Sequence, residues 1–180
     1  GNVVILGRDE HKGLSAVKNI EAKGGIAFFA QADVMDEDSL IRAKDLILQR
    51  FGKISGLVNA AGGNVPEAVL QPEADIFSLS MSGMKKALDL NVWGTLLPTQ
   101  IFGAELVKEE TGSIVNISSV STVRPLTKVL GYSMAKSAID MDPFEDAYQQ
   151  ADWSEYEGMP LFRAANRMNA YNVYLSIQAE

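Results

Sequence analysis

The stretch that decides the fold is Gly131-Tyr-Ser-Met-Ala-Lys136, which follows the strand-like run Gly112-Ser-Ile-Val-Asn-Ile-Ser-Ser119. Tyr132 and Lys136 are four residues apart, so on a helix they share one face. A free phenol with a pKa of about 10 is a poor acid-base catalyst at neutral pH, and a neighbouring ammonium lowers that pKa by favouring the phenolate. Together with Ser119, the pair describes proton delivery to a carbonyl group.

Short apolar runs alternate with amphipathic segments before this stretch. Strands alternating with helices indicate a parallel sheet covered on both faces, the α/β class. The segment 62–80, which contains two prolines, is expected to be a long loop. The apolar patterns predict strands over 3–6, 26–30, 54–59 and 114–117, and helices over 9–23, 39–51 and 84–107.

Composition narrows the classes of function. The 180 residues, 47% apolar and 22% charged, predict one main globular unit. A net charge of −7 disfavours nucleic-acid and membrane-surface partners, and no apolar run is long enough for a membrane helix. The chain has no cysteine and one histidine, His11, which excludes thiolate and multi-histidine metal sites. We expect a cytoplasmic protein that holds no metal.

A Tyr-x-x-x-Lys pair alone also occurs by chance on solvated helix faces. Here three further motifs precede it in order: Asp33-Val34, Asn59-Ala-Ala-Gly62 and Asp89-Leu-Asn-Val-Trp-Gly94. With them, residues 1 to 140 resemble the short-chain dehydrogenase/reductase family. The resemblance implies a Rossmann-like, doubly wound parallel sheet and NAD(P)-dependent hydride transfer between nicotinamide and a carbonyl or alcohol.

The resemblance also implies roles for four side chains. Tyr132 would be the general acid-base, Lys136 its pKa-lowering partner and a ribose ligand, and Ser119 the residue that orients the substrate. Asn91 would hold a water that links the lysine to solvent, and the Asn-Val-x-Gly context favours this role over that of a plain surface asparagine. Ser118 is then expected to be a strand-end residue whose hydroxyl bonds to the backbone.

Cofactor contacts are expected at the carboxyl ends of the strands. Arg8 follows the first strand, where an arginine favours the 2′-phosphate of NADP, while the adjacent Asp9 makes the signal mixed. Asp33 and Val34 would hold the adenine ring. The motif Asn59-Ala60-Ala61-Gly62 ends in small residues, which lets backbone approach the nicotinamide ribose. The alternative for Arg8 is an exposed residue at a helix start with Asp9 as the cap, and the alternative for the other two motifs is a structural turn.

The chain departs from the family pattern at both ends. The family begins with a strand and a glycine-rich phosphate-binding turn, and this chain starts after them, as if N-terminally truncated. We therefore expect a gap in the sheet between the strands that start near Val3 and Ile54. After Asp140 the sequence Met141-Asp-Pro143 replaces the family pattern. Residues 141–180 are interpreted as a helical tail of different origin from the core at 1–140.

The residues around 55–135 are similar to members that act on sugar acids, such as mannonate or gluconate dehydrogenases. We expect a small carbonyl or polyol substrate, NADP or NAD as cofactor, and a homo-oligomer. The alternative is a catalytically inactive fragment or fusion remnant, acting at most as an interaction module, whose sheet is completed by a partner or by the tail.

Overall fold

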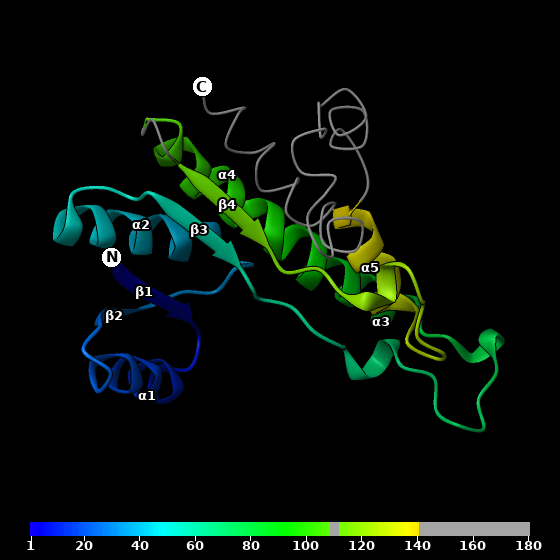
Figure 1. The fold of residues 1–180 in the computed structure, drawn as a ribbon. Coiled ribbons are helices and arrows are strands. Elements are labelled where there is room, and N and C mark those ends of the chain that lie inside the picture. The colour runs from blue at the N-terminus through cyan, green and yellow to red at the C-terminus, as the bar shows by residue number, and fades with distance from the viewer. Residues whose placement is uncertain (109–111, 141–180) are drawn as a thin grey trace, which may run out of the picture.

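The computed structural model describes residues 1–108 and 112–140 (Figure 1). Within these ranges the strands are β1 (Asn2–Gly7), β2 (Ile26–Gln31), β3 (Gly56–Asn59) and β4 (Ser113–Asn116). The α-helices are α1 (Glu10–Glu21), α2 (Glu37–Phe51), α3 (Met81–Leu88), α4 (Gly94–Leu106) and α5 (Leu130–Asp140). Short helical turns are η1 (Pro66–Ala68), η2 (Ile76–Ser78), η3 (Asp89–Trp93) and η4 (Val120–Thr122).

All strand pairing in the described residues is parallel. β1 pairs with β2 from Asn2↔Ile26 to Gly7↔Gln31, and β3 pairs with β4 from Gly56↔Ser113 to Asn59↔Asn116. Parallel neighbours need a crossover connection, and here helices supply it. The predicted α/β class with parallel strands and helices is confirmed as a partial Rossmann-like fold.

Local sequence sets where the helices begin and end. Asp9 and Asp36 accept hydrogen bonds from the first-turn amides of Lys12 and Ser39, which caps α1 and α2. Gly52 ends α2 at a φ of +79°, a left-handed conformation that glycine adopts without strain. The caps fix the ends of the two helices that flank the first strand pair.

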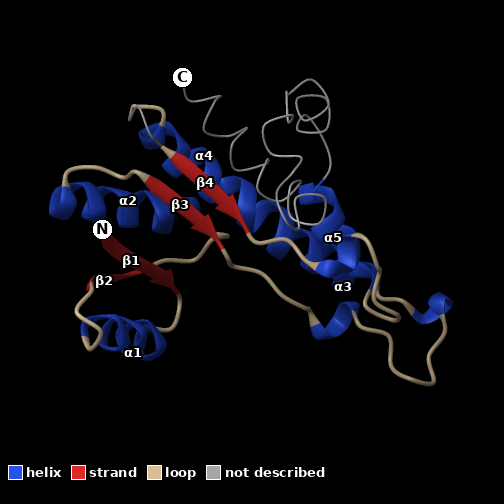
Figure 2. Ribbon diagram, viewed as in Figure 1, coloured by secondary structure: helices blue, strands red, loops and turns tan. Residues whose placement is uncertain are grey.

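Helices cover both faces of the first strand pair (Figure 2). Alternate residues of a strand point to opposite faces, and β2 follows this rule. Phe28 contacts Phe51 of α2 edge-on at 6.3 Å between ring centroids, while Phe29 lies against Gly13 of α1. Gly13 has no room for a side chain, since a Cβ would lie 2.1 Å from the Phe29 ring.

The main core lies between α2, α4 and the strands. Leu40 and Ile47 of α2 are buried with Phe102 and Leu106 of α4 and with Ile114 of β4. Because α2 packs on β2 and α4 packs on β3 and β4, the contact between these two helices joins the two strand pairs. The two halves of the molecule are therefore connected through helices.

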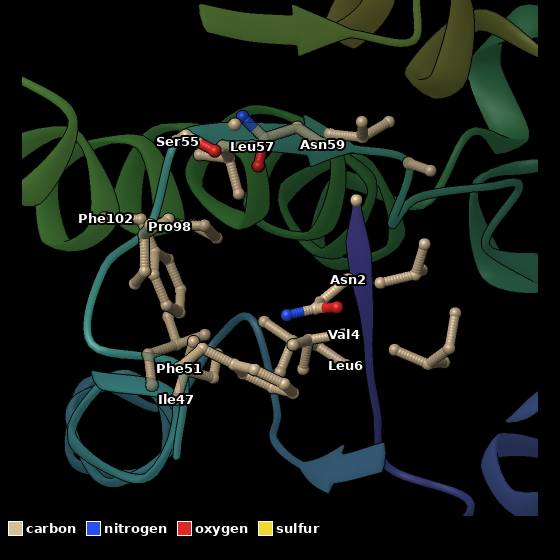
Figure 3. A pocket seen from close by; sticks show the side chains of 18 of the residues that line it. Asn2, Val4, Leu6, Ile47, Phe51, Ser55, Leu57, Asn59, Pro98 and Phe102 are labelled. Carbon is tan, nitrogen blue, oxygen red and sulfur yellow. The ribbon is translucent and has the colours of Figure 1, made fainter. Parts of the chain in front are cut away.

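The two strand pairs do not join into one sheet. β1 and β3 are not hydrogen-bonded to each other, and a cavity of about 870 Å³ lies between them. Val4 and Leu6 of β1 and Leu57 of β3 point into it, as do Phe51 and Phe102 (Figure 3). The gap expected from the sequence is confirmed. We call this cavity the interstrand slot.

Several element boundaries differ from the sequence prediction. The helix expected over 84–107 begins at Met81 and is interrupted by the π-helical turn η3. The loop expected over 62–80 contains the turns η1 and η2. The tail predicted at 141–180 lies outside the described residues. Among the helices that are described, none is both long and apolar enough to span a membrane.

Candidate active site

Lys136 is a buried cation at the centre of the candidate site. It lies on α5, is 5% exposed, and its Nζ donates a 2.7 Å hydrogen bond to the carbonyl oxygen of Ile117, just past β4. Burial lowers the pKa of Lys136 below its ordinary value of 10.5, because the charged form loses hydration. The ammonium is thus held at the carboxyl end of β4.

Tyr132 lies beside this ammonium. The Lys136 Nζ is 5.9 Å from the centroid of the Tyr132 ring, which is within the range of a cation–π contact. Both residues come from α5, one helical turn apart, so the helix itself sets their spacing. The positive charge of Lys136 therefore lies against the ring of Tyr132.

Ser119 is the N-cap of η4, and η4 packs on α5. Its Oγ accepts hydrogen bonds from the backbone N–H of Ser121 at 3.2 Å and from the Ser121 hydroxyl at 3.0 Å. A hydroxyl has two acceptor lone pairs and one proton. With both acceptor positions used, the Ser119 proton remains to be donated to another group.

Ser118 corrects one prediction. Its hydroxyl was expected to bond to the backbone, but the Oγ is buried without a hydrogen-bond partner. Ser118 lies two residues beyond β4, in the segment between that strand and η4. The expectation about this side chain was wrong.

Asn91 is fully buried in the π-helical turn η3. Its Nδ2 donates to the carbonyl oxygens of Gly63 at 2.9 Å and Ala87 at 2.8 Å, and its Oδ1 accepts from the Gly63 N–H at 2.9 Å. The side chain therefore clamps the loop after β3 onto η3. The role of Asn91 in holding a water remains a prediction.

Gly62 occupies a crowded position next to this clamp. A Cβ added there would lie 2.6 Å from Asn91 Oδ1 and 3.5 Å from Lys136 Nζ. Its φ of +150° is also one that side-chain-bearing residues rarely adopt. Gly62 thus brings bare backbone next to the Lys136 ammonium, with Ala60 and Ala61 as the small residues before it.

A polar ladder connects Asn91 to the strand ends. Thr95 Oγ1 donates to the Asn91 carbonyl oxygen at 2.9 Å, and Thr99 Oγ1 donates to the Thr95 carbonyl oxygen at 2.9 Å. Asn59 Nδ2 then donates to Thr99 Oγ1 and to Asn116 Oδ1, each at 2.8 Å. Neither threonine was predicted from the sequence, although the four-residue spacing from Asn91 to Thr95 and from Thr95 to Thr99 was a usable signal.

The remaining predicted cofactor residues form a second group at the ends of β1 and β2. The Arg8 guanidinium lies 3.8 Å from the Asp33 carboxylate, and Asp33 Oδ1 accepts from the Met35 N–H at 2.9 Å. Val34 lies against Gly94 at the start of α4, where a Cβ would be 3.1 Å from Val34 Cγ2. Arg8 is therefore already paired with an acidic side chain.

Taken with the parallel α/β fold, these two groups place the chain in the Rossmann-like class of proteins. The model of the short chain dehydrogenase family matches residues 1–143, and the chain belongs to this family.

Individual relatives agree with this membership. An uncharacterized oxidoreductase of Bacillus subtilis, UxuB, is 41% identical over 146 residues, covering 77% of this chain and 52% of the relative. An uncharacterized oxidoreductase of Haemophilus influenzae is 32% identical over 148 residues, with the same coverage of 77% and 52%. The chain thus spans about half the length of these curated relatives.

Among solved structures, a candidate D-mannonate oxidoreductase from Haemophilus influenza, with NAD bound, superposes with a TM-score of 0.72. It is 31% identical, and the superposition covers 86% of this chain and 58% of that one.

Proposed function

We propose that this chain provides the catalytic part of an NAD(P)-dependent oxidoreductase that transfers a hydride between nicotinamide and a carbonyl or alcohol. The observation that carries the proposal is the joint placement of Tyr132, Lys136 and Gly62. The buried ammonium lies beside the phenol ring and next to backbone that leaves no room for a side chain.

The residues present fit a nicotinamide riboside. Gly62 offers bare backbone, Lys136 offers donors beyond its bond to Ile117, and Ser119 has a proton to donate. When bound, the cofactor supplies or accepts the hydride.

Tyr132 would give its phenolic proton to a substrate oxygen, or take one from it, with the Lys136 ammonium beside its ring. Ser119 would donate to the same oxygen and steady the charge that develops there. Asn91 would fix the loop that carries Gly62.

The substrate class we propose is a small polyol acid. The solved structure described as a candidate D-mannonate oxidoreductase supports it, with 31% identity. We further propose that the active form is a homo-oligomer located in the cytoplasm.

For the cofactor we propose NADP, with NAD as the alternative. Arg8 has the charge to bind a 2′-phosphate, but its pairing with Asp33 at 3.8 Å opposes that binding. The relative with bound NAD supports the alternative.

A second candidate function, an inactive interaction module, is favoured by one observation, the interstrand slot. Cofactor titration separates the two candidates. Quenching of protein fluorescence by NADPH or NADH at micromolar concentration, abolished by Lys136→Met, is expected for the oxidoreductase. No response at millimolar concentration would contradict the enzyme proposal.

A further inference from the structure

The hydrogen bonds that hold the candidate site form a closed ring, and Thr99 of α4 joins its two halves. One half begins at Lys136, whose Nζ donates to the carbonyl oxygen of Ile117 at 2.7 Å. The Ile117 N–H in turn donates to the carbonyl oxygen of Asn59, the last residue of β3, at 2.9 Å. This half of the ring ties the ammonium to the ends of β3 and β4.

The other half of the ring holds the loop after β3. Asn91 Oδ1 accepts from the Gly63 N–H at 2.9 Å, and the Thr95 hydroxyl donates to the Asn91 carbonyl oxygen at 2.9 Å. Gly62 comes directly before Gly63, and a Cβ on Gly62 would lie 3.5 Å from Lys136 Nζ. The ring therefore closes where the bare backbone of Gly62 faces the ammonium.

The Thr99 hydroxyl connects the two halves because it both donates and accepts. It donates its proton to the Thr95 carbonyl oxygen at 2.9 Å, and its oxygen accepts from Asn59 Nδ2 at 2.8 Å. A helical threonine commonly bonds to the carbonyl four residues earlier, and Thr95 does the same. Thr99 differs from Thr95 because its oxygen also accepts from a strand residue. β3 and β4 both pack on α4, so this bond is a polar link between the helix and the strand ends (Figure 1).

We propose that Thr99 is a positioning residue of the candidate active site. Its two hydrogen bonds set the distance between Asn59 and Gly63, the two anchored ends of the segment that carries Gly62. The inference rests on the proposed function, in which Gly62 and Lys136 both contact the nicotinamide riboside. Thr99 acts through its two hydrogen-bond partners and not on the substrate itself.

The first test measures amide hydrogen exchange at Gly63 in the whole chain. Thr99→Val removes the hydroxyl and keeps the shape of the side chain, while Thr99→Ser keeps the hydroxyl. Amides that join β1 and β2 serve as the internal reference, because they report a general loss of stability. Relative to this reference, exchange at Gly63 should be about tenfold faster in Thr99→Val than in Thr99→Ser. Equal relative exchange in the two variants would overturn the proposal.

If Thr99→Val does not fold, Thr99→Cys takes its place, since a thiol is of similar size and is only a weak donor and acceptor. Thr127→Val, at an exposed threonine, is the matched control for the loss of a hydroxyl. This control should leave the relative exchange at Gly63 unchanged. The same change in Thr127→Val as in Thr99→Val would also overturn the proposal.

The second test measures the Kd of NADH and NADPH by fluorescence quenching, together with kcat. Thr99→Val should raise the Kd by about tenfold, and Thr99→Ser should restore it. The value of kcat should change by less than about threefold, because Tyr132 is not part of the ring. An unchanged Kd in Thr99→Val would overturn the positioning role. Absence of cofactor binding in the unaltered chain would contradict the proposed function instead, and exchange at Gly63 would then decide the inference by itself.

Discussion

β3 has one complete edge, which is hydrogen-bonded to β4, and one open edge, which has no strand partner among the described residues. Toward β4, all four residues of β3 are in register with partners, and the Asn59 side chain adds a hydrogen bond to Asn116. Toward β1, the same strand faces the interstrand slot. The proposed catalytic residues all belong to the complete side, where Ser118 Oγ is the one buried side-chain polar atom without a hydrogen-bond partner among the described residues.

The second group, Arg8 and Asp33, lies across the open edge. The side that carries Tyr132 and Lys136 is therefore held by its own hydrogen bonds, while its position relative to Arg8 and Asp33 depends on the contact between α2 and α4. A substitution can therefore change the arrangement of Tyr132 and Lys136 without changing that of Arg8 and Asp33.

The largest expected effect is on turnover and comes from a substitution on the complete side of β3. Tyr132→Phe removes the phenolic proton and should lower turnover by about 10²- to 10⁴-fold, without loss of helical circular dichroism. Met134→Ala, at an exposed position of the same helix, is the matched control. Turnover in Tyr132→Phe equal to that of the control would refute the assignment.

Phe102→Ala should perturb both sides together. Phe102 is 2% exposed in the core that joins the two strand pairs, so its truncation should cost about 3–5 kcal/mol in the free energy of unfolding. Urea denaturation measures this change. Phe77→Ala, at a side chain that is 92% exposed, should change it by less than about 0.5 kcal/mol. Similar values for the two variants would show that the halves are not joined through this core.

Gly62→Ala tests the crowded backbone beside Lys136. Gly62 and Gly63 share a φ of +150°, but only at Gly62 does a Cβ meet other atoms. Backbone strain of about 1–3 kcal/mol is expected in both Gly62→Ala and the matched control Gly63→Ala. Weaker binding of NAD(P)H is expected only in Gly62→Ala. Equal cofactor affinities would contradict the proposed role of Gly62.

Arg8→Asp changes the second group of residues, which lies across the interstrand slot from β3. Replacing the cation should shift cofactor preference toward NADH by about tenfold in the ratio of kcat/KM values, equivalent to about 1.4 kcal/mol. The tyrosine-dependent step should be unaffected, because Arg8 lies in the other group of residues. An unchanged ratio would show that Arg8 does not bind the 2′-phosphate.

The smallest expected effect is on the pH dependence of the free energy of unfolding. Burial lowers the folded-state pKa of Lys136 below 10.5, so the unfolded chain binds more protons between the two pKa values. The contribution of Lys136 to stability is unfavourable below its folded-state pKa, and this penalty is relieved as pH rises toward 10.5. The difference in unfolding free energy between the wild type and Lys136→Met should therefore change in favour of the wild type across this window. A difference that is constant with pH would contradict a lowered pKa.

The sequence predicted the parallel α/β fold because its apolar runs and caps, such as Asp9 and Asp36, are local signals. The gap between β1 and β3 was predicted from the family pattern. The π-helical turn at Asn91 was missed, because the periodicity of 81–106 does not reveal which backbone bonds are shifted. The Thr95 and Thr99 bonds are local bonds to the carbonyl four residues earlier, so their spacing was a signal that the prediction did not use. The unpaired Ser118 hydroxyl depends on a side-chain direction that follows only from the tertiary structure.

Native-state amide exchange of the unaltered chain tests the contrast between the two edges of β3 most directly. The amides of β3 and β4 that join these strands should be protected close to the level of global unfolding, while the slot-facing amides of β1 and β3 should exchange far faster. Equal strong protection of both edges would contradict the account.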